Sequence, residues 1–191
     1  MKRIILILAL IVFISSCGNG SKKADSSAVN DTQIEQTEKE SSINPEDLKE
    51  LLSQAIPLTE TEFKNAFPTS IKGLPLDGEV SITNAKCKQG YATYGNENIT
   101  LSIYDCAGEC SGMATMFGTV YSIKAQDNDD TKYSNQKRDA IKTTNTYRVK
   151  RNQSDIVFLH NNRWYVVIKG NNMNPDELWN AFELNALKNF K

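Results

Sequence analysis

The chain has 191 residues, of which 39% are hydrophobic and 24% charged, and its formal net charge is −1 at pH 7. The length suits one domain with additional segments, the composition excludes a polytopic membrane protein, and the balanced charge argues against nucleic-acid binding. A single histidine, His160, leaves little scope for zinc catalysis or Ser-His-Asp chemistry.

The first 17 residues have the pattern of a secretion signal. Lys2 and Arg3 precede an unbroken apolar run over residues 4–14. This run is too short to cross a bilayer, because a transmembrane helix needs about 20 residues, but its length is typical of a signal-peptide core. We therefore interpret residues 1–16 as a signal peptide.

The end of this segment, Ile14-Ser15-Ser16-Cys17, resembles the lipobox of bacterial lipoproteins. The resemblance implies cleavage before Cys17 and acylation of that residue with a diacylglyceryl group and an amide-linked fatty acid such as palmitate. Two or three acyl chains on one residue form a stable membrane anchor. We expect a lipid-anchored protein of the bacterial cell envelope, placed at the outer membrane because Gly18 rather than Asp follows the cysteine.

Residues 17–44 lack apolar periodicity and consist mainly of Ser, Asn, Thr, Gln, Lys and Glu. Such a segment cannot bury enough apolar surface to offset the entropy of ordering it. It is predicted to be a disordered tether that begins at the lipidated Cys17, and residues 45–191 are predicted to form a single α+β domain.

Four segments of this domain have helical signals. Asn44 before Pro45 is a good helix start, Thr59 or Thr61 could cap a second short helix, and Asn174 before Pro175 repeats the first signal. The remaining helix is predicted over residues 111–124, where apolar side chains recur at helical spacing. Its predicted buried face consists of Met113, Met116, Phe117, Val120 and Tyr121.

The strand signals lie between the helices. Residues 80–82 alternate, and residues 86–106 are predicted to form a hairpin in which an Asn96-Glu97 turn places Ala92 opposite Leu101. A second hairpin is predicted from residues 155–160 and 163–169. Another strand is predicted over residues 145–151. Together these segments favour an antiparallel sheet packed with helices.

The second hairpin is predicted to turn at Asn161-Asn162, a pair that tolerates positive φ. With this turn, Val157 shares a face with Val166, and Phe158 shares the other face with Val167. Both faces are apolar, so these strands are expected to be central and covered on both sides.

The order of these parts resembles a group of uncharacterised secreted or lipid-anchored bacterial proteins with a PsbP/Mog1-like domain. The resemblance is carried by Pro57-Leu58-Thr59-Glu60, Gly73-Leu74-Pro75, the hairpin end Ser102-Ile103-Tyr104-Asp105-Cys106-Ala107-Gly108, and Asp176-Glu177-Leu178. It implies an α/β/α sandwich over residues 45–191. Members of such sandwiches are mostly binding or assembly factors, which bears on function only by analogy.

Three cysteines remain after Cys17, and a disulfide is plausible in the cell envelope. With the Asn96-Glu97 turn, Cys87 lies directly opposite Cys106, within disulfide reach. A turn shifted by one pair would instead make Cys87–Cys110 possible. The favoured hypothesis is one disulfide between Cys87 and Cys106, with Cys110 as the alternative partner.

The remaining candidates for chemistry are weak. Cys106 and Cys110 have CxxxC spacing rather than the CxxC of thioredoxin-like proteins. The acidic run at Asp127, Asp129 and Asp130 lacks the glycine and glutamate of a calcium-binding loop. We therefore expect no catalytic residue, no cofactor-binding residue and no metal ligand, and we expect that the protein is not an enzyme.

The expected function is a non-enzymatic binding or accessory role in the cell envelope. The expected partners are the membrane, through the lipid anchor, and an envelope protein, but not nucleic acid. The first alternative is an apolar-ligand carrier or sensor with a cavity under the helix at Met113–Tyr121. A hydrolase or redox enzyme built on dispersed residues is the less favoured alternative.

Overall fold

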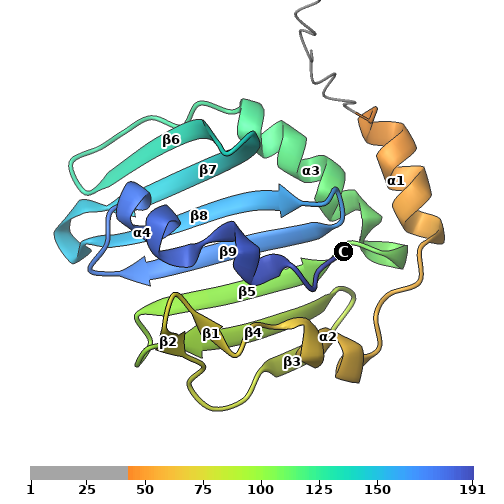
Figure 1. Ribbon diagram of the computed structural model, residues 1–191. Coiled ribbons are helices and arrows are strands. Elements are labelled where there is room, and N and C mark those ends of the chain that lie inside the picture. The colour runs from red at the N-terminus through yellow and green to blue at the C-terminus, as the bar shows by residue number, and fades with distance from the viewer. Residues whose placement is uncertain (1–42) are drawn as a thin grey trace, which may run out of the picture. The chain divides into compact units, whose positions relative to one another are not determined.

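A seven-stranded antiparallel sheet is the centre of the computed structural model, which describes residues 43–191 (Figure 1). The strand order is β3-β4-β5-β9-β8-β7-β6, and β1 and β2 form a separate two-stranded ribbon. The strands are β1 (Ser70–Ile71), β2 (Leu74–Pro75), β3 (Ser81–Asn84), β4 (Lys88–Tyr94), β5 (Ile99–Asp105), β6 (Thr131–Arg138), β7 (Ile141–Arg148), β8 (Gln153–His160) and β9 (Trp164–Asn171). The helices are α1 (Pro45–Gln54), α2 (Glu60–Ala66), α3 (Ser111–Ser122) and α4 (Pro175–Phe182), with 3-10 turns η1 (Gly108–Cys110), η2 (Val149–Arg151) and η3 (Leu184–Leu187). The predicted α+β class is confirmed.

The predicted signal peptide, the lipidated Cys17 and most of the tether lie outside the described residues. The described residues belong to one compact unit. Within residues 43–191, no helix is long and apolar enough to cross a membrane.

The helix starts predicted from the sequence are confirmed by their caps. The Asn44 side chain accepts a hydrogen bond from the Glu46 N–H at 3.1 Å. Thr59 forms a capping box with Glu62, in which each side chain accepts from the other residue's backbone N–H. Asn174 caps α4 in the same way. Caps satisfy N–H groups that have no partner within the helix, so they hold each helix start at a defined residue.

One face of the sheet, the α4 face, is covered by α2, α4 and the C-terminal residues, and it carries most of the aromatic core. Phe63, Phe67, Trp164 and Phe190 pack ring against ring, with centroids 5.2–5.9 Å apart. Phe158 packs in the same layer against two side chains of α4. Such aromatic pairs contribute more to stability than the burial of their surface area alone. The α4 face therefore supplies much of the packing that stabilises the domain.

The opposite face, the α3 face, is only partly covered, by α3 and by α1 outside it. Leu48 and Leu52 of α1 pack with Ala114 of α3 and with the buried Cys106. Helix α3 packs on β7, β8 and β9, and α1 packs on α3. Helices therefore lie on both sides of the sheet (Figure 1).

The first hairpin has the predicted register. Ala92 lies opposite Leu101, and Gly90 lies opposite Ile103. Gly90 is required by packing, because a Cβ added there would lie 2.4 Å from the ring of Phe67.

The second hairpin differs from the prediction. Its loop has three residues, Asn161, Asn162 and Arg163, so that His160 lies opposite Trp164. Both asparagines have positive φ, 49° and 56°. The additional loop residue shifts the register by one position, which exchanges the faces of one strand relative to the other.

The predicted sharing of faces was therefore wrong. Phe158 lies opposite Val166, and both are buried on the α4 face. Val157 lies opposite Val167 on the α3 face, and both are only half-buried. The two central strands are fully covered on the α4 face alone.

The edge strand β6 was not predicted, and the strand predicted over residues 145–151 is β7, which begins earlier. β6 pairs with β7 along its full length. At its free edge, the Tyr133 N–H donates to Asp127 Oδ1 at 2.8 Å, and the Thr131 carbonyl accepts from the Asn128 N–H at 3.0 Å. The loop before β6 thus covers the first half of an edge that would otherwise be open to strand addition.

Two helices also depart from their predicted patterns. In α3, Phe117 is buried as expected, but Met116 is 50% exposed. The last helix ends at Phe182, since Glu183 adopts a φ of 54°, and Phe190 is buried in the segment beyond it.

Candidate functional site: the open face of the sheet

The α3 face is not covered over β4, β5 and the part of β9 that carries Val167 and Lys169. The side chains that line a shallow depression of about 350 Å³ there are Gln89, Tyr91, Thr100, Ser102, Tyr104, Val167 and Lys169. Pairing places them side by side: Tyr91 lies opposite Ser102, and Ser102 lies opposite Val167. We call this set the open face.

The open face is rich in hydrogen-bonding groups. It presents hydroxyl groups on Tyr91, Thr100, Ser102 and Tyr104, and no carboxylate belongs to this set. Tyr91 is 44% exposed, one of the most exposed large aromatic side chains in the described domain. Neighbouring strands lie about 4.8 Å apart, so the hydroxyl groups form a flat array with an aromatic ring at its side. Such a surface can bind a partner by hydrogen bonds and by packing against the ring.

Tyr165 forms the boundary between the open and covered parts of the α3 face. Its ring contacts Tyr104 of the open face at 5.9 Å and Phe117 of α3 at 6.3 Å, both edge to face. Burial raises the pKa of Tyr165, and Tyr104 and Cys106 add to the effect. Tyr165 therefore stays neutral. Because its ring contacts both Phe117 and Tyr104, the position of α3 affects the position of Tyr104 in the open face.

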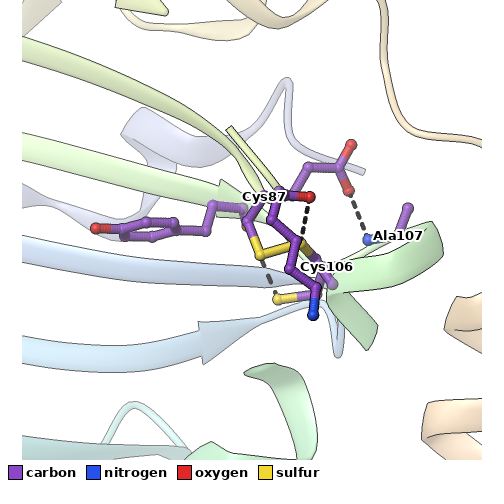
Figure 2. The surroundings of a disulfide bond; sticks show 7 residues. Cys87, Cys106 and Ala107 are labelled. Atoms are coloured by element: carbon purple, nitrogen blue, oxygen red, sulfur yellow. Dashed lines mark hydrogen bonds between the residues drawn. A yellow bond between two sulfur atoms is a disulfide. The ribbon is translucent and has the colours of Figure 1, made fainter. Parts of the chain in front are cut away.

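The cysteines lie at the end of the sheet beside η1 (Figure 2). Cys87 is bonded to Cys110, with the Cα atoms 5.4 Å apart. The favoured pairing of Cys87 with Cys106 was wrong, and the alternative partner is the one observed. The register was as predicted, but strand pairing stops at Gln89 and Tyr104, so the direct opposition does not extend to the cysteines.

Cys106 instead remains a buried free thiol. Its backbone N–H donates to the Arg163 carbonyl, so the chain follows β9 at this point rather than β4. Burial raises the pKa of the Cys106 thiol to about 12. A thiol in this state is a poor nucleophile, because the thiolate is the reactive form.

A buried ion pair that the sequence analysis missed lies next to the disulfide. Both carboxylate oxygens of Asp105 accept hydrogen bonds from Arg163, each at 2.9 Å. The backbone N–H groups of Leu58 and Ala107 also donate to Asp105, at 3.0 Å. Arg163 in turn donates to the Ile56 carbonyl. All of these contacts are internal, so this group joins the α1–α2 linker to β5 and to the β8–β9 loop.

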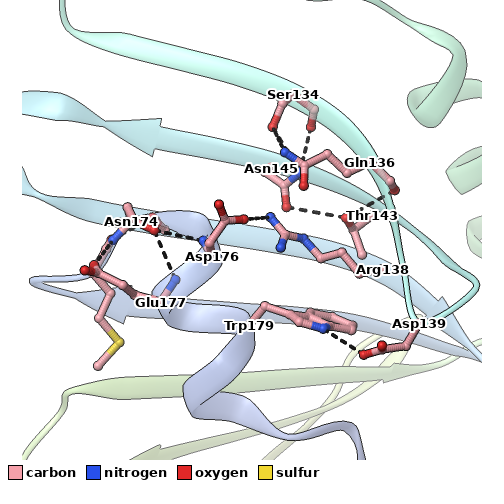
Figure 3. Close-up of polar contacts among 12 residues, drawn as sticks. Ser134, Gln136, Arg138, Asp139, Thr143, Asn145, Asn174, Asp176, Glu177 and Trp179 are labelled. Atoms are coloured by element: carbon pink, nitrogen blue, oxygen red, sulfur yellow. Dashed lines mark hydrogen bonds and ion pairs between the residues drawn. The ribbon is translucent and has the colours of Figure 1, made fainter.

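A second polar cluster joins α4 to the β6–β7 hairpin (Figure 3). Arg138 contacts Asp176 at 2.7 Å and lies over the ring of Trp179, whose indole N–H donates to Asp139 at 3.1 Å. The amide of Asn145 donates to the Ser134 carbonyl at 2.9 Å. The contacts of Arg138 and Trp179 hold the helix on the sheet, whereas Asn145 joins β7 to β6.

The other residues singled out in the sequence lie apart from these sites. His160 is half-buried at the end of β8, where burial lowers its pKa. Asp127 and Asp130 pair with Lys132 and Lys150. Among residues 43–191, no group of three His, Cys, Asp or Glu side chains is arranged to hold a metal ion.

The space under α3, where a ligand cavity was hypothesised, is occupied by side chains. Ala114 and Phe117 are buried there between the helix and the sheet. The open face itself could have been inferred from the sequence only in part. The alternation of Thr100, Ser102 and Tyr104 with apolar residues indicates a polar face, but not whether a helix covers it.

Comparison with known proteins does not assign the chain to a group. No family model, no curated protein and no solved structure matches it.

Proposed function

We propose that this chain is a lipid-anchored protein of the bacterial cell envelope that binds an envelope partner without catalysing a reaction. The open face is the proposed contact surface for that partner. The observation that carries the proposal is the uncovered array around Tyr91 on a sheet whose other face is fully packed.

The anchor part of the proposal is supported by the sequence. The short apolar run, the small residues and Cys17 form a lipobox-like signal, and the tether would let the domain extend from the bilayer. We place the anchor at the outer membrane on the basis of Gly18. The resemblance to PsbP/Mog1-like domains supports a binding role by analogy.

The binding part is supported by the chemistry of the open face. Most residues of the open face are partly exposed, and they combine hydroxyl groups, an amide and an aromatic ring. Tyrosine is enriched at interfaces, because it supplies contact area and a hydrogen bond together. This combination of groups on an uncovered part of the sheet supports recognition of another molecule.

The experiment is site-specific photocrosslinking in cells. A benzophenone amino acid replaces Tyr91 on the open face, and a matched chain carries it at Tyr147. Tyr147 is the control because it lies opposite the buried Ser154, on the α4 face of the same sheet. We expect one adduct of defined size from position 91 and none from position 147.

Equal adducts from both positions would indicate non-specific proximity. The absence of an adduct from position 91 in a chain that is folded and membrane-bound would contradict the proposed contact surface.

A further inference from the structure

The C-terminal end of α3 carries a second exposed surface with a different chemistry. Ile123 is 57% exposed, Met116 is 50% exposed and Tyr133 of β6 is 39% exposed. Ile123 and Tyr133, together with Tyr121 and Lys124, line a groove of about 700 Å³ whose wall is mainly apolar. Lys142 lies beside this groove, over the Tyr121 ring, and Met116 precedes Val120 of the groove wall by one turn of α3. We call the six residues the amphiphilic patch: Met116, Tyr121, Ile123, Lys124, Tyr133 and Lys142.

The patch is held in a fixed shape. The side-chain amide of Asn135 donates to the backbone carbonyls of Tyr121 and Ile123, which fastens the end of α3 to β6. The Lys142 ammonium lies 5.8 Å from the centre of the Tyr121 ring. The exposed apolar side chains are therefore presented by a rigid support, with basic groups beside them.

The charges of the described domain are distributed unevenly around this patch. Residues 123–151 contain eight Lys and Arg against four Asp and Glu, whereas the rest of residues 43–191 contains nine against fourteen. Of the four acids in residues 123–151, Asp127 and Asp130 pair with Lys132 and Lys150, and Asp139 accepts from Trp179 on the α4 face. A domain with this asymmetry turns its basic end toward a negatively charged surface.

The chain outside the structure enters at the same end. The start of η1, just before α3, lies close to the end of α1, because a Cβ at Gly108 would lie 4.0 Å from the Ala55 carbonyl. The two helices are therefore antiparallel, and the first turn of α1 lies toward the last turn of α3 (Figure 1). The described chain begins at Ile43, and residues 1–42, which include the proposed anchor at Cys17, precede it in the sequence.

We propose that the amphiphilic patch docks on the surface of an anionic lipid bilayer, an inference that rests on the proposed lipid anchor for its membrane. Ile123 and Met116 enter the headgroup region, Tyr121 and Tyr133 lie at its boundary, and Lys124 and Lys142 contact lipid phosphates. Exposed aliphatic side chains, tyrosines and lysines are the combination that binds at membrane interfaces. A second copy of the chain is a poorer occupant, because a two-fold contact would bring the lysines of the two patches together.

The docking would be weak without the anchor and effective with it. A lipid anchor keeps the domain close to the bilayer, so that a second, weak contact with the same membrane forms intramolecularly. Docking would then fix which way the open face points. Each basic side chain at an anionic surface contributes roughly a fivefold change in binding. Loss of both lysines is expected to lower the equilibrium constant for docking by about 25-fold.

The experiment measures contact with lipid at a single residue. The full chain is purified in its lipidated form and reconstituted into vesicles of phosphatidylethanolamine and phosphatidylglycerol with brominated acyl chains, which quench tryptophan at short range. One chain carries Ile123→Trp as the reporter, and its matched control carries Asn185→Trp on the opposite side of the domain. Trp164 and Trp179 are buried on the α4 face, and their signal is subtracted with the parent chain.

We expect quenching and a blue shift for Ile123→Trp and neither for Asn185→Trp. Adding Lys124→Gln and Lys142→Gln is expected to remove the quenching. Adding Lys64→Gln and Lys188→Gln, two lysines elsewhere on the domain, is expected to leave it unchanged. Vesicles of phosphatidylcholine alone are expected to quench much less.

Flotation of the same vesicles separates the two proposals. If the chain floats with the vesicles but Ile123→Trp is not quenched, the anchor stands and the docking surface is overturned. If the chain carries no lipid and does not float, the anchor is wrong. The Ile123→Trp chain is then titrated with preformed anionic vesicles up to a large excess of lipid, because docking without the anchor is weak. Quenching that rises with lipid concentration supports the docking surface, and its absence at the highest concentration overturns it.

Discussion

The buried pair of Asp105 and Arg163 is predicted to be one of the largest single polar contributions to the stability of the domain. Asp105 is fully buried, and Arg163 supplies two of its four hydrogen bonds. Replacing Arg163→Met keeps most of the aliphatic stem and leaves the carboxylate without its counter-charge. Removing one partner of a buried pair costs about 3–5 kcal/mol, a large share of the roughly 5–15 kcal/mol that stabilises a typical domain.

The assay is urea unfolding followed by tryptophan fluorescence, on the parent, Arg163→Met, Asp105→Asn and the double variant. The double-mutant cycle should give a coupling energy of about 2–3 kcal/mol, because the two side chains share their hydrogen bonds. The matched control is Lys64→Met, which breaks an exposed pair with Glu60 at 3.2 Å and should cost less than about 1 kcal/mol. A loss below about 1 kcal/mol for Arg163→Met would refute the reasoning.

Three further predictions concern the disulfide, the histidine and the tight glycine. Cys87→Ser opens a loop closed across 23 residues and should lower the free energy of unfolding by about 3 kcal/mol, measured by thermal unfolding of oxidised protein. Because burial lowers the folded-state pKa of His160, the unfolded chain binds the proton more readily, so stability should fall as pH drops from about 7 through the unfolded value near 6.5. His160→Gln should flatten that pH dependence of unfolding. Gly90→Ala should destabilise by about 1–3 kcal/mol by displacing Phe67, whereas Gly112→Ala, on an open helix surface, should stabilise by about 0.5–1 kcal/mol in the same melts.

The helix starts were predictable because their signals are local. Asn44, Thr59 and Asn174 each bond to a backbone N–H two or three residues away, so the residues that decide the cap are adjacent in the sequence. The first hairpin register followed for the same reason, since its turn lies between the two strands that it aligns.

The missed features depend on contacts between distant segments. Strand β6 contains no aliphatic residue and is ordered by pairing with β7 and by Asp127 at its edge, so its own composition gives no strand signal. The β8–β9 register changed because Arg163 belongs to the loop, where its side chain reaches Asp105, 58 residues away. A two-residue turn satisfied the local pattern equally well.

The sequence predicts which residues share the polar side of β5, but it does not predict that this side is exposed. Alternation along β5 indicates that Ser102 and Tyr104 share a polar side. The coverage of that side depends on where α3 packs, which is decided by Phe117 against Tyr165. The cysteine pairing was similarly decided by the path of the chain after Asp105 rather than by the hairpin register.

The most direct test of a membrane-tethered binding module is the crosslink from position 91, compared in cells between the chain with Cys17 and the Cys17→Ala variant. The account predicts one adduct of defined size when Cys17 carries lipid, and loss of both membrane association and adduct in Cys17→Ala. The absence of an adduct from the folded, lipidated chain would contradict the binding role. An unmodified Cys17 in the purified chain would contradict the anchor.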